Sequence, residues 1–144
     1  MLAQDNRALA HRPHEEVYNQ GKLEVVEQIY ASDFVMHSPG IPPNLPRGPE
    51  GVKQFVTILR AAFPDLHLTI EDSIAEGDRV VNRWAFRGTQ KGEFDGIPPT
   101  GKQVTLTGID IWRISGGKLV ELWQELDFAG LLQQLGAIPA PQAA

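Results

Sequence analysis

The chain of 144 residues contains no cysteine, which excludes disulfide bonds, thiolate nucleophiles and cysteine-ligated zinc or iron–sulfur sites. It also has no long apolar run, and the N-terminal stretch MLAQDNRALAHRPHEE carries charge throughout. The sequence therefore predicts neither a signal peptide nor a membrane-spanning helix. Basic residues are few, because 13 Lys and Arg stand against 18 Asp and Glu for a net charge of −5. We expect a cytoplasmic protein with no nucleic-acid partner and no membrane partner.

The motifs of several catalytic classes are missing as well. The histidines lack the helical spacing of HExxH, and no carboxylate-rich calcium loop occurs, so we expect no metal site. GxSxG, GxGxxG and GxxxxGK[ST] are absent too, which argues against a hydrolase elbow, a dinucleotide site and a P-loop. The sequence predicts a site that works with no cofactor.

Length and composition fit one domain spanning residues 1–144, with 42% hydrophobic and 22% charged residues. Five of the eleven prolines lie in a loop at residues 39–49, and residues 137–144 form a C-terminal tail. Apolar residues at helical spacing predict one helix before this loop, over 22–30, and one after it, over 52–63.

From Leu66 onward the apolar residues follow a period of two, which predicts a sheet. Gly77-Asp78 and Gly116-Gly117 are tight-turn sequences and predict two antiparallel hairpins. A short final helix follows at 128–135. Helices first and an antiparallel sheet afterwards favour an α+β fold, in which a strongly curved sheet wraps over a helix. The predicted strands cover residues 66–75, 79–90, 102–115 and 118–126.

Three of these strands carry one hydrogen-bonding residue on an otherwise apolar face: Asn82, Asp110 and Gln124. Burying such groups without partners would cost about 1–3 kcal/mol each, and more for a charge. Asp110 and Gln124 flank the second hairpin and are expected to be near neighbours across it. A carboxyl beside an amide in an apolar cavity suits an acid, a base or an oxyanion site. An internal network that fixes the curvature of the sheet explains the pattern equally well.

The same alternation predicts that Val120 faces inward on the last strand, and that Leu119 and Trp123 face outward. This outer face also carries Arg83 and Arg87 of the neighbouring strand. A homodimer would cover such a face, and helix packing explains it equally well.

Two histidines are candidates for the site. His37 ends a short strand-like stretch directly before the proline loop, and either His37 or Ser38 faces the pocket, since one bulge would exchange them. His14 follows Pro13, which either starts a helix or kinks a longer one that begins near Gln4.

Three stretches carry a resemblance to a known family: VYNQGKLEVVEQIYASDFVMHSPG, EGDRVVNRWAFRGTQKGEFDGIPPTGKQV and GIDIWRISGGKLVELWQELDFAGLLQQLG. They resemble SnoaL-like polyketide cyclases of the nuclear-transport-factor-2-like superfamily, over about residues 4–136. The closing W-x-x-x-D-x-x-G-L-x-x-Q-L-G is the most specific part. The resemblance implies a cone-shaped α+β barrel, a curved antiparallel sheet around helices with a deep pocket, and a homodimer formed through the outer sheet face.

The family's catalytic positions are occupied differently here. In aklanonic-acid-type cyclases an aspartate on the last strand is the general acid/base of an aldol closure, and that position holds Gln124. The family's histidine position holds Asp110, and its asparagine position falls near His37 or Ser38. Similarity to ketosteroid isomerase places Asp110 at the protonated oxyanion donor, His14 near the helix tyrosine and Ser38 at the base. Of the three residues of limonene-epoxide hydrolase, only Asp110 has a counterpart.

The leading hypothesis is a SnoaL-like acid/base enzyme, a cyclase or isomerase acting on a small, largely apolar carbonyl compound. In it His37 is the base, Asp110 is the acid or oxyanion donor, Gln124 and Asn82 orient the substrate, and His14 is a second donor. The predicted apolar wall consists of Trp84, Phe86, Trp112 and Leu122.

Three other functions remain open. The chain could be a non-catalytic protein that binds a hydrophobic ligand, or it could have an epoxide hydrolase-like activity. It could also be a dimeric scaffold whose pocket is filled by Trp84 and Trp112.

Overall fold

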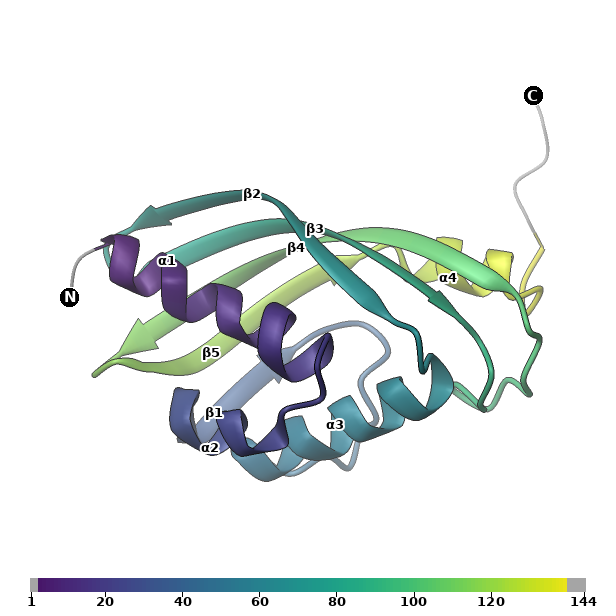
Figure 1. The fold of residues 1–144 in the computed structure, drawn as a ribbon, viewed down its shortest axis with the longest axis horizontal. Coiled ribbons are helices and arrows are strands. Elements are labelled where there is room, and N and C mark those ends of the chain that lie inside the picture. Colours follow the sequence, from purple (N-terminus) through teal and green to yellow (C-terminus); the bar gives the residue numbers. More distant parts are fainter. Residues whose placement is uncertain (1–2, 140–144) are drawn as a thin grey trace.

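The computed structural model describes residues 3–139 and has the predicted α+β organisation. Helices and one strand come first, and four further strands and a short helix follow (Figure 1). Residues 140–144 of the predicted tail lie outside the described residues. No helix within 3–139 has the length and apolarity needed to cross a bilayer. The elements are α1 (Ala3–Arg12), η1 (Pro13–Tyr18), α2 (Leu23–Ile29), β1 (Tyr30–His37), α3 (Pro49–Ala62), β2 (His67–Glu76), β3 (Arg79–Thr89), β4 (Gln103–Ser115), β5 (Lys118–Leu126) and α4 (Phe128–Gln134).

The N-terminal helix changes its winding at Pro13. The α-helix α1 ends at Arg12, and the π-helical segment η1 continues directly from it. Proline has no N–H to donate and clashes with the preceding turn, so it disturbs the regular helical hydrogen bonds at this point. Of the two alternatives for Pro13, the longer helix is present, and its wider turns begin at Pro13, next to His14.

The five strands form one curved, open sheet in the order β1-β5-β4-β3-β2. β1 pairs with β5 in parallel, and all other neighbours are antiparallel. The sheet arches over α1 and α3 without closing, since β1 and β2 occupy its two edges (Figure 1). The predicted curved sheet around helices is confirmed, in an open form rather than as a closed barrel.

Both predicted hairpins are present, but a bulge corrects the prediction for one strand face. The register of β4 against β5 shifts between Arg113 and Ile114, so that Ile114 pairs with Leu119. Leu119 is consequently buried in the core, whereas Val120 is half-buried. The extra residue reverses the alternation next to the turn, which sequence periodicity cannot anticipate.

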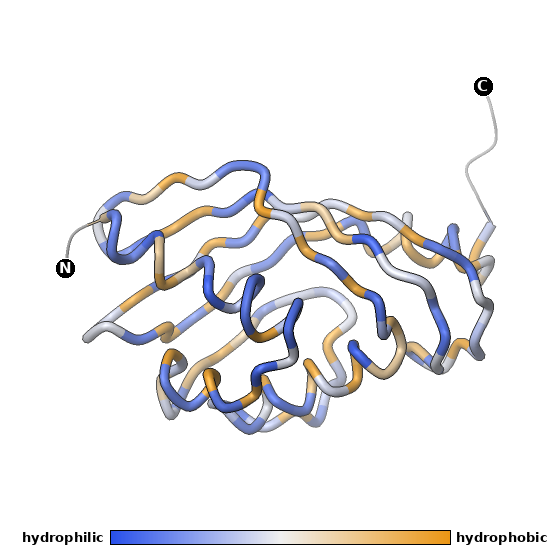
Figure 2. The backbone as a smooth tube through the Cα atoms, in the orientation of Figure 1, coloured by the Kyte–Doolittle hydropathy of each residue, from blue (hydrophilic) through white to orange (hydrophobic). Residues whose placement is uncertain are grey.

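The core lies between the concave face of the sheet and the helices. Hydrophobic and hydrophilic residues alternate along the strands (Figure 2), which gives the sheet one apolar and one polar face. One cluster of buried side chains packs α1, η1, α2 and α3 against the sheet around Trp112. A second cluster lies around Phe63, Phe86 and Leu131, toward α4.

The long connection from β3 to β4 is held by one buried amide. Gln90 is fully buried, and its Nε2 donates to the carbonyls of Gly92 and Ile97. Its Oε1 accepts from the backbone N–H and the hydroxyl of Thr100. Because every polar atom of this side chain is paired, the connection has a fixed shape near the second core cluster.

Candidate active site

Asp110 is the centre of the candidate site. It is fully buried on the concave face of β4, where the strand register pairs it with Gln124 of β5 and Asn82 of β3. Its Oδ1 accepts two hydrogen bonds, from Trp84 Nε1 at 2.8 Å and from Gln124 Nε2 at 2.9 Å. The predicted proximity of Asp110 and Gln124 is confirmed. Two donors on Oδ1 leave Oδ2 as the oxygen available for chemistry.

The position of Trp84 depends on a glycine opposite it. Trp84 pairs with Gly108 in the β3–β4 register, and the indole ring lies on the glycine backbone. A Cβ at position 108 would lie 2.3 Å from Cζ2 of Trp84, a distance that no side chain tolerates. The missing side chain of Gly108 therefore lets the indole N–H reach Asp110.

His14 approaches Asp110 from the helical side. The imidazole is buried, and its Nε2 lies 3.0 Å from Oδ2 of Asp110. The two atoms are close, but their orientation is not that of a hydrogen bond. Within residues 3–139, Oδ2 of Asp110 and Nδ1 of His14 have no hydrogen-bond partner. The pair is thus in contact and still has free hydrogen-bonding capacity.

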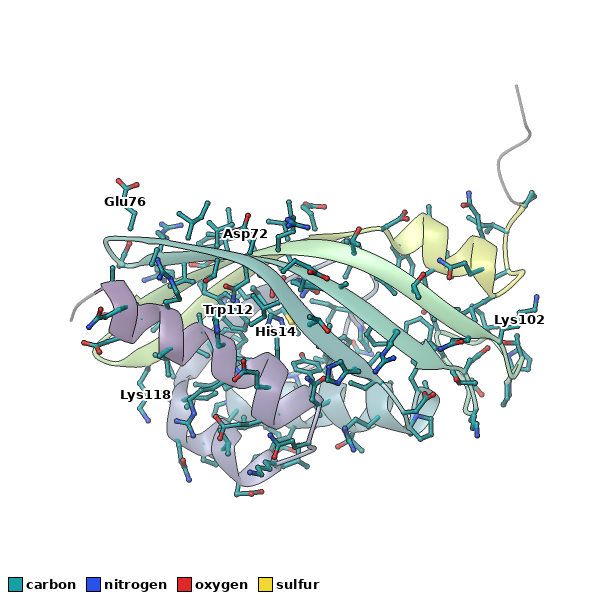
Figure 3. The ribbon with its side chains drawn as sticks, turned by 45° about the horizontal axis from the view of Figure 1, so that its top comes forward. His14, Asp72, Glu76, Lys102, Trp112 and Lys118 are labelled. Atoms are coloured by element: carbon teal, nitrogen blue, oxygen red, sulfur yellow. The ribbon has the colours of Figure 1, made fainter. Side chains whose placement is uncertain are left out.

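A narrow cavity of about 80 Å³ lies beside this pair. Figure 3 shows His14 and Trp112 on the helix side of the sheet, whereas Asp72 and Glu76 project from the other side. Pockets that enclose a drug-sized ligand usually measure about 300–1,000 Å³, so a substrate enters this cavity only if lining side chains move. The predicted residues that line it are His14, Trp84, Phe86, Asp110, Trp112, Leu122 and Gln124.

Three buried polar atoms around this cavity have no partner in the described part of the chain. They are Nδ1 of His14, Oδ2 of Asp110 and Nε1 of Trp112. Buried polar atoms are nearly always hydrogen-bonded, so each exception requires an explanation. Together they offer an indole N–H donor, one carboxyl oxygen, and an imidazole nitrogen that donates or accepts according to its tautomer.

Sequence reasoning missed part of the wall. Tyr18 of η1 lines the cavity, as do the aromatic rings of Phe55, Phe63 and Phe128. Burial raises the pKa of Tyr18 above its usual value. The spacing of His14 and Tyr18, four residues apart on one helix, could have indicated that both face inward.

His37 is the main correction to the predicted site. Its Nε2 lies 2.7 Å from Oε2 of Glu121, and its ring stacks on Trp123 on the outer face of the sheet. The parallel register pairs His37 with Trp123, so the two side chains share a face that points away from Asp110. Ser38 turns inward instead, and its Oγ donates to Oε1 of Gln124 at 2.7 Å.

Asn82 also differs from the prediction, since it does not line the cavity. Its Oδ1 accepts from Oγ of Ser73 at 2.8 Å, and its Nδ2 donates to the carbonyl of Ala10 at 3.1 Å. Nε2 of His11 contacts the same serine hydroxyl at 3.1 Å. These contacts attach the end of α1 to β2 and β3. Asn82 therefore belongs to an internal structural network, in which its Oδ1 and Nδ2 both have protein partners.

Metal-ligating side chains do not gather at this site. Within residues 3–139 no group of three His, Asp or Glu side chains is arranged to hold a metal ion. The polar groups at the cavity are one carboxyl, one imidazole, one amide, the Tyr18 hydroxyl and indole N–H donors. This set can donate, accept and transfer protons.

Comparison with known proteins agrees with this architecture. The family model of SnoaL-like polyketide cyclases matches residues 8–135. Aklanonic acid methyl ester cyclase DnrD of Streptomyces peucetius is 32% identical over 124 residues, covering 84% of this chain and 84% of that protein. Nogalonic acid methyl ester cyclase of Streptomyces nogalater is 28% identical over 120 residues, covering 83% and 89%.

A solved structure extends the similarity to three dimensions. TsrD from Streptomyces laurentii superimposes with a TM-score of 0.86 and 30% identity, covering 96% of this chain and 99% of TsrD. The family model and this likeness both span nearly the whole described fold, including the strands that carry Asp110 and Gln124. The chain belongs to the SnoaL-like polyketide cyclase family.

Proposed function

We propose that this chain is an acid/base enzyme of the cyclase or isomerase type, acting without a cofactor on a small, largely apolar carbonyl compound. The observation that carries the proposal is the set of unpartnered polar atoms on His14, Asp110 and Trp112 around one apolar cavity. A carbonyl oxygen is the group that uses such donors in an otherwise apolar molecule.

In the proposed reaction, Trp112 Nε1–H donates a hydrogen bond to the carbonyl oxygen. Asp110 gives a proton from Oδ2 to this oxygen, while His14 accepts a proton from the adjacent carbon. The product of this step is an enol. In a cyclase the enol carbon attacks a second carbonyl, His14 protonates the new alkoxide, and the enol proton returns to Asp110. In an isomerase His14 instead returns its proton to another carbon of the substrate, and the enol proton again returns to Asp110.

The remaining contacts orient the acid. Trp84 and Gln124 hold Oδ1 of Asp110, and Ser38 holds the amide of Gln124 by donating to its Oε1. Because the carboxyl group fixed in this way does not rotate freely, Oδ2 stays directed at the position where it transfers a proton. Gln124 is in this proposal a positioning residue, because a carboxamide is neither a general acid nor a general base at neutral pH.

The test measures enolisation directly. In D₂O, 2-tetralone exchanges the protons next to its carbonyl, and the protein is expected to accelerate the exchange followed by ¹H NMR. Asp110→Asn and His14→Gln should each lower the rate at least about 100-fold. His37→Gln is the matched control and should retain it. If His37→Gln abolishes the exchange while His14→Gln does not, the assignment of the base is wrong.

The relatives suggest a substrate to try next. Two of them are cyclases of aklanonic and nogalonic acid methyl esters. Ring closure of aklanonic acid methyl ester gives a product of the same mass. Mass alone therefore does not distinguish the product from the substrate, and the two are separated by chromatography. A closure that requires Asp110 would support the cyclase form of the proposal.

A binding protein is the second candidate function, and Gln124 favours it. The amide stands where the resemblance places the catalytic carboxylate, and the aromatic wall suits an apolar ligand. This alternative predicts that an apolar ketone raises the melting temperature by mass action. It also predicts that the ketone's protons exchange no faster than in buffer.

We also propose that a second copy of this chain covers the outer face of the sheet. Ile74, Val81, Ile111 and Trp123 are register neighbours from β2 to β5 and form one transverse apolar stripe. At its β5 end, the Trp123 ring lies against Arg79 and His37. Ile74 is 62% exposed and Ile111 is 38% exposed. A continuous apolar stripe on an exposed sheet face marks an interaction surface.

Charges beside the stripe favour one symmetry for this dimer. Arg79 and Arg83 lie on the outer face of β3, and Glu121 and Glu125 lie on that of β5. A two-fold axis parallel to β4 places β3 of one copy over β5 of the other, so that arginines face glutamates. An axis across the strands would place arginine over arginine, which electrostatic repulsion disfavours.

A further inference from the structure

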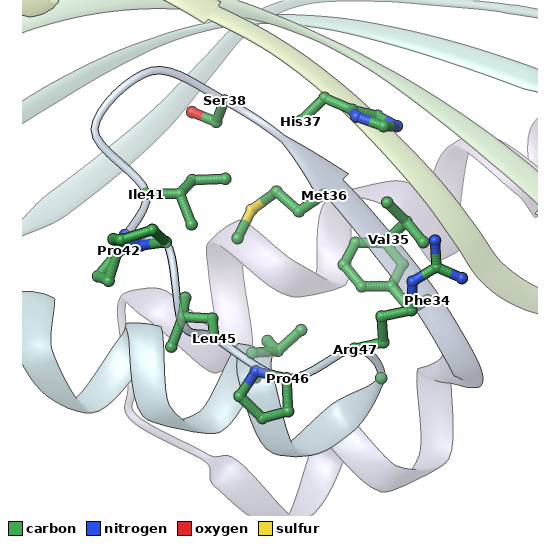
Figure 4. Close-up of a pocket in the computed structure, with 14 residues that line it drawn as sticks. Phe34, Val35, Met36, His37, Ser38, Ile41, Pro42, Leu45, Pro46 and Arg47 are labelled. Carbon is green, nitrogen blue, oxygen red and sulfur yellow. The ribbon is translucent and has the colours of Figure 1, made fainter.

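A second pocket, separate from the cavity at Asp110, lies beneath the proline-rich loop between β1 and α3. Its volume is about 360 Å³, which falls within the usual range of small-molecule sites. Figure 4 shows the loop passing over this space, with Met36, Ile41 and Leu45 pointing toward its centre. The pocket shares no lining residue with the inner cavity.

The loop is fixed at both ends and spans the pocket between them. At one end, Ser38 donates to Gln124, and Gly40 lies against the ring of Phe128. At the other end, the N–H of Gly48 donates to the carbonyl of Phe34 at 2.9 Å, and the φ of Gly48 is +80°. A side chain at position 48 would collide with the carbonyl of Ser32. Prolines stiffen the segment in between, so the pocket is a built feature of the fold.

The lining of this pocket combines an apolar end with a cationic end. Met36, Ile41 and Leu45 form the apolar end. Arg47 lines the pocket on the side opposite Ile41 (Figure 4). None of the ion pairs and hydrogen bonds found within residues 3–139 involves the Arg47 guanidinium. His37, the other ionisable group at the rim, is already engaged by Glu121.

We propose that the proline-loop pocket binds a small molecule with an apolar body and one carboxylate. The planar guanidinium of Arg47 offers paired N–H donors that match a carboxylate. No Asp or Glu side chain lines the pocket, and Glu121 at its rim is paired with His37. Pro42, Pro43 and Pro46 of the lining have no backbone N–H, and Arg47 is the cationic donor there that no ion pair within residues 3–139 engages. This pocket has no lining residue in common with the cavity at Asp110.

The methionine content of the chain makes a sharp test possible. The sequence has two methionines, Met1 and Met36, so a ¹³C-methyl methionine label reports on the pocket through one internal signal. We expect 1-naphthoate to shift the Met36 methyl signal by its ring current, in a saturable way. The indole N–H signal of Trp84, which reports on the inner cavity, should not change.

Two variants and one neutral probe complete the experiment. Arg47→Ala should weaken 1-naphthoate binding about tenfold or more, because it removes the charge-assisted hydrogen bonds. Arg87→Ala, on the outer face of the sheet, is the matched control and should bind normally. Ile41→Trp should block binding by filling the pocket. The neutral 1-naphthalenemethanol should bind at least tenfold more weakly than the acid.

Other results would overturn the proposal. An unchanged Met36 signal excludes the site, and a shift of the Trp84 signal alone places the probe in the inner cavity. Equal binding of the acid and the alcohol, or full binding by Arg47→Ala, contradicts the assigned role of the guanidinium. None of these readouts depends on catalysis, so they separate a failure of this site from a failure of the proposed enzyme.

Discussion

The two faces of the sheet have opposite distributions of polar and apolar residues. The concave face is apolar with single polar residues, Asn82, Asp110 and Gln124, whereas the convex face is charged with one apolar stripe across it. On the concave face every polar group is paired except those around the cavity. On the convex face charged groups pair in water, where each pair contributes little. The exceptions to each pattern, orphan polar atoms inside and an apolar stripe outside, mark the two candidate functional surfaces.

The largest expected effect comes from placing a charge in the apolar stripe. Ile111→Asp would bury two like charges near the proposed two-fold axis, which should cost the dimer about 3–5 kcal/mol. Sedimentation velocity is expected to show a dimer for the natural chain and a monomer for the variant. Ile58→Asp, at an exposed isoleucine of α3, is the control and should remain dimeric. A natural chain that sediments as a monomer contradicts the dimer.

The second prediction tests the packing that holds Asp110. Gly108→Ala would drive a methyl group into the Trp84 ring, so we expect a loss of about 1–3 kcal/mol in the free energy of unfolding. The indole N–H signal of Trp84 should also move, because its bond to Asp110 is displaced. Urea unfolding and ¹H–¹⁵N NMR measure the two effects. Thr107→Ala, one residue away on the outer face, should change neither, and an unaltered Gly108→Ala protein would refute the argument.

A third prediction distinguishes a structural role of Asn82 from a catalytic one. Asn82→Ala removes the partner of Ser73 and of the Ala10 carbonyl, which should cost about 2 kcal/mol of stability. Ser73→Ala removes one of these contacts and should cost less. Both variants are expected to keep the 2-tetralone exchange rate in their folded form. Loss of exchange in a folded Asn82→Ala protein would show that Asn82 takes part in the reaction.

The smallest expected effect is a pH dependence on the convex face. The hydrogen bond from His37, together with Arg113, lowers the pKa of Glu121 below its usual value. A lowered pKa in the folded state stabilises the protein above the unfolded-state value of 4.5, and this contribution disappears as the pH falls. Glu121→Gln should therefore flatten the acid limb of stability measured by urea unfolding between about pH 6 and 3. An acid limb identical to that of the natural chain would mean that the Glu121 contacts do not contribute to the free energy of unfolding.

Much of the fold was predictable because its signals are local. Val52, Phe55, Val56 and Leu59 follow helical spacing and Pro64 ends the pattern, so α3 appears where periodicity places it. The glycine turns at 77–78 and 116–117 define both hairpins and bring Asp110 next to Gln124. The bulge at Arg113/Ile114 was not predictable, since an extra residue in one strand leaves no periodic trace in the sequence.

The candidate site was only partly predictable, because its members come from distant segments. Asp110, Gln124 and the wall residues were found from strand alternation. The base was predicted at His37, which a parallel pairing with Trp123 turns to the outer face. The histidine that lies next to Asp110 is His14, because η1 packs beneath the sheet, and no local pattern determines the direction of a histidine beside a proline.

The sequence by itself determined the elements, the antiparallel order of β2 to β5 and the polar residues on the concave face. These features depend on periodicities and turns that span a few residues. Within residues 3–139, the tertiary structure decided which polar groups meet, which remain without a partner and which oxygen of Asp110 accepts no hydrogen bond. Those outcomes depend on the curvature of the sheet and on the docking of η1 and the proline loop. Contacts between segments about 100 residues apart are set by packing of the whole core rather than by any local rule.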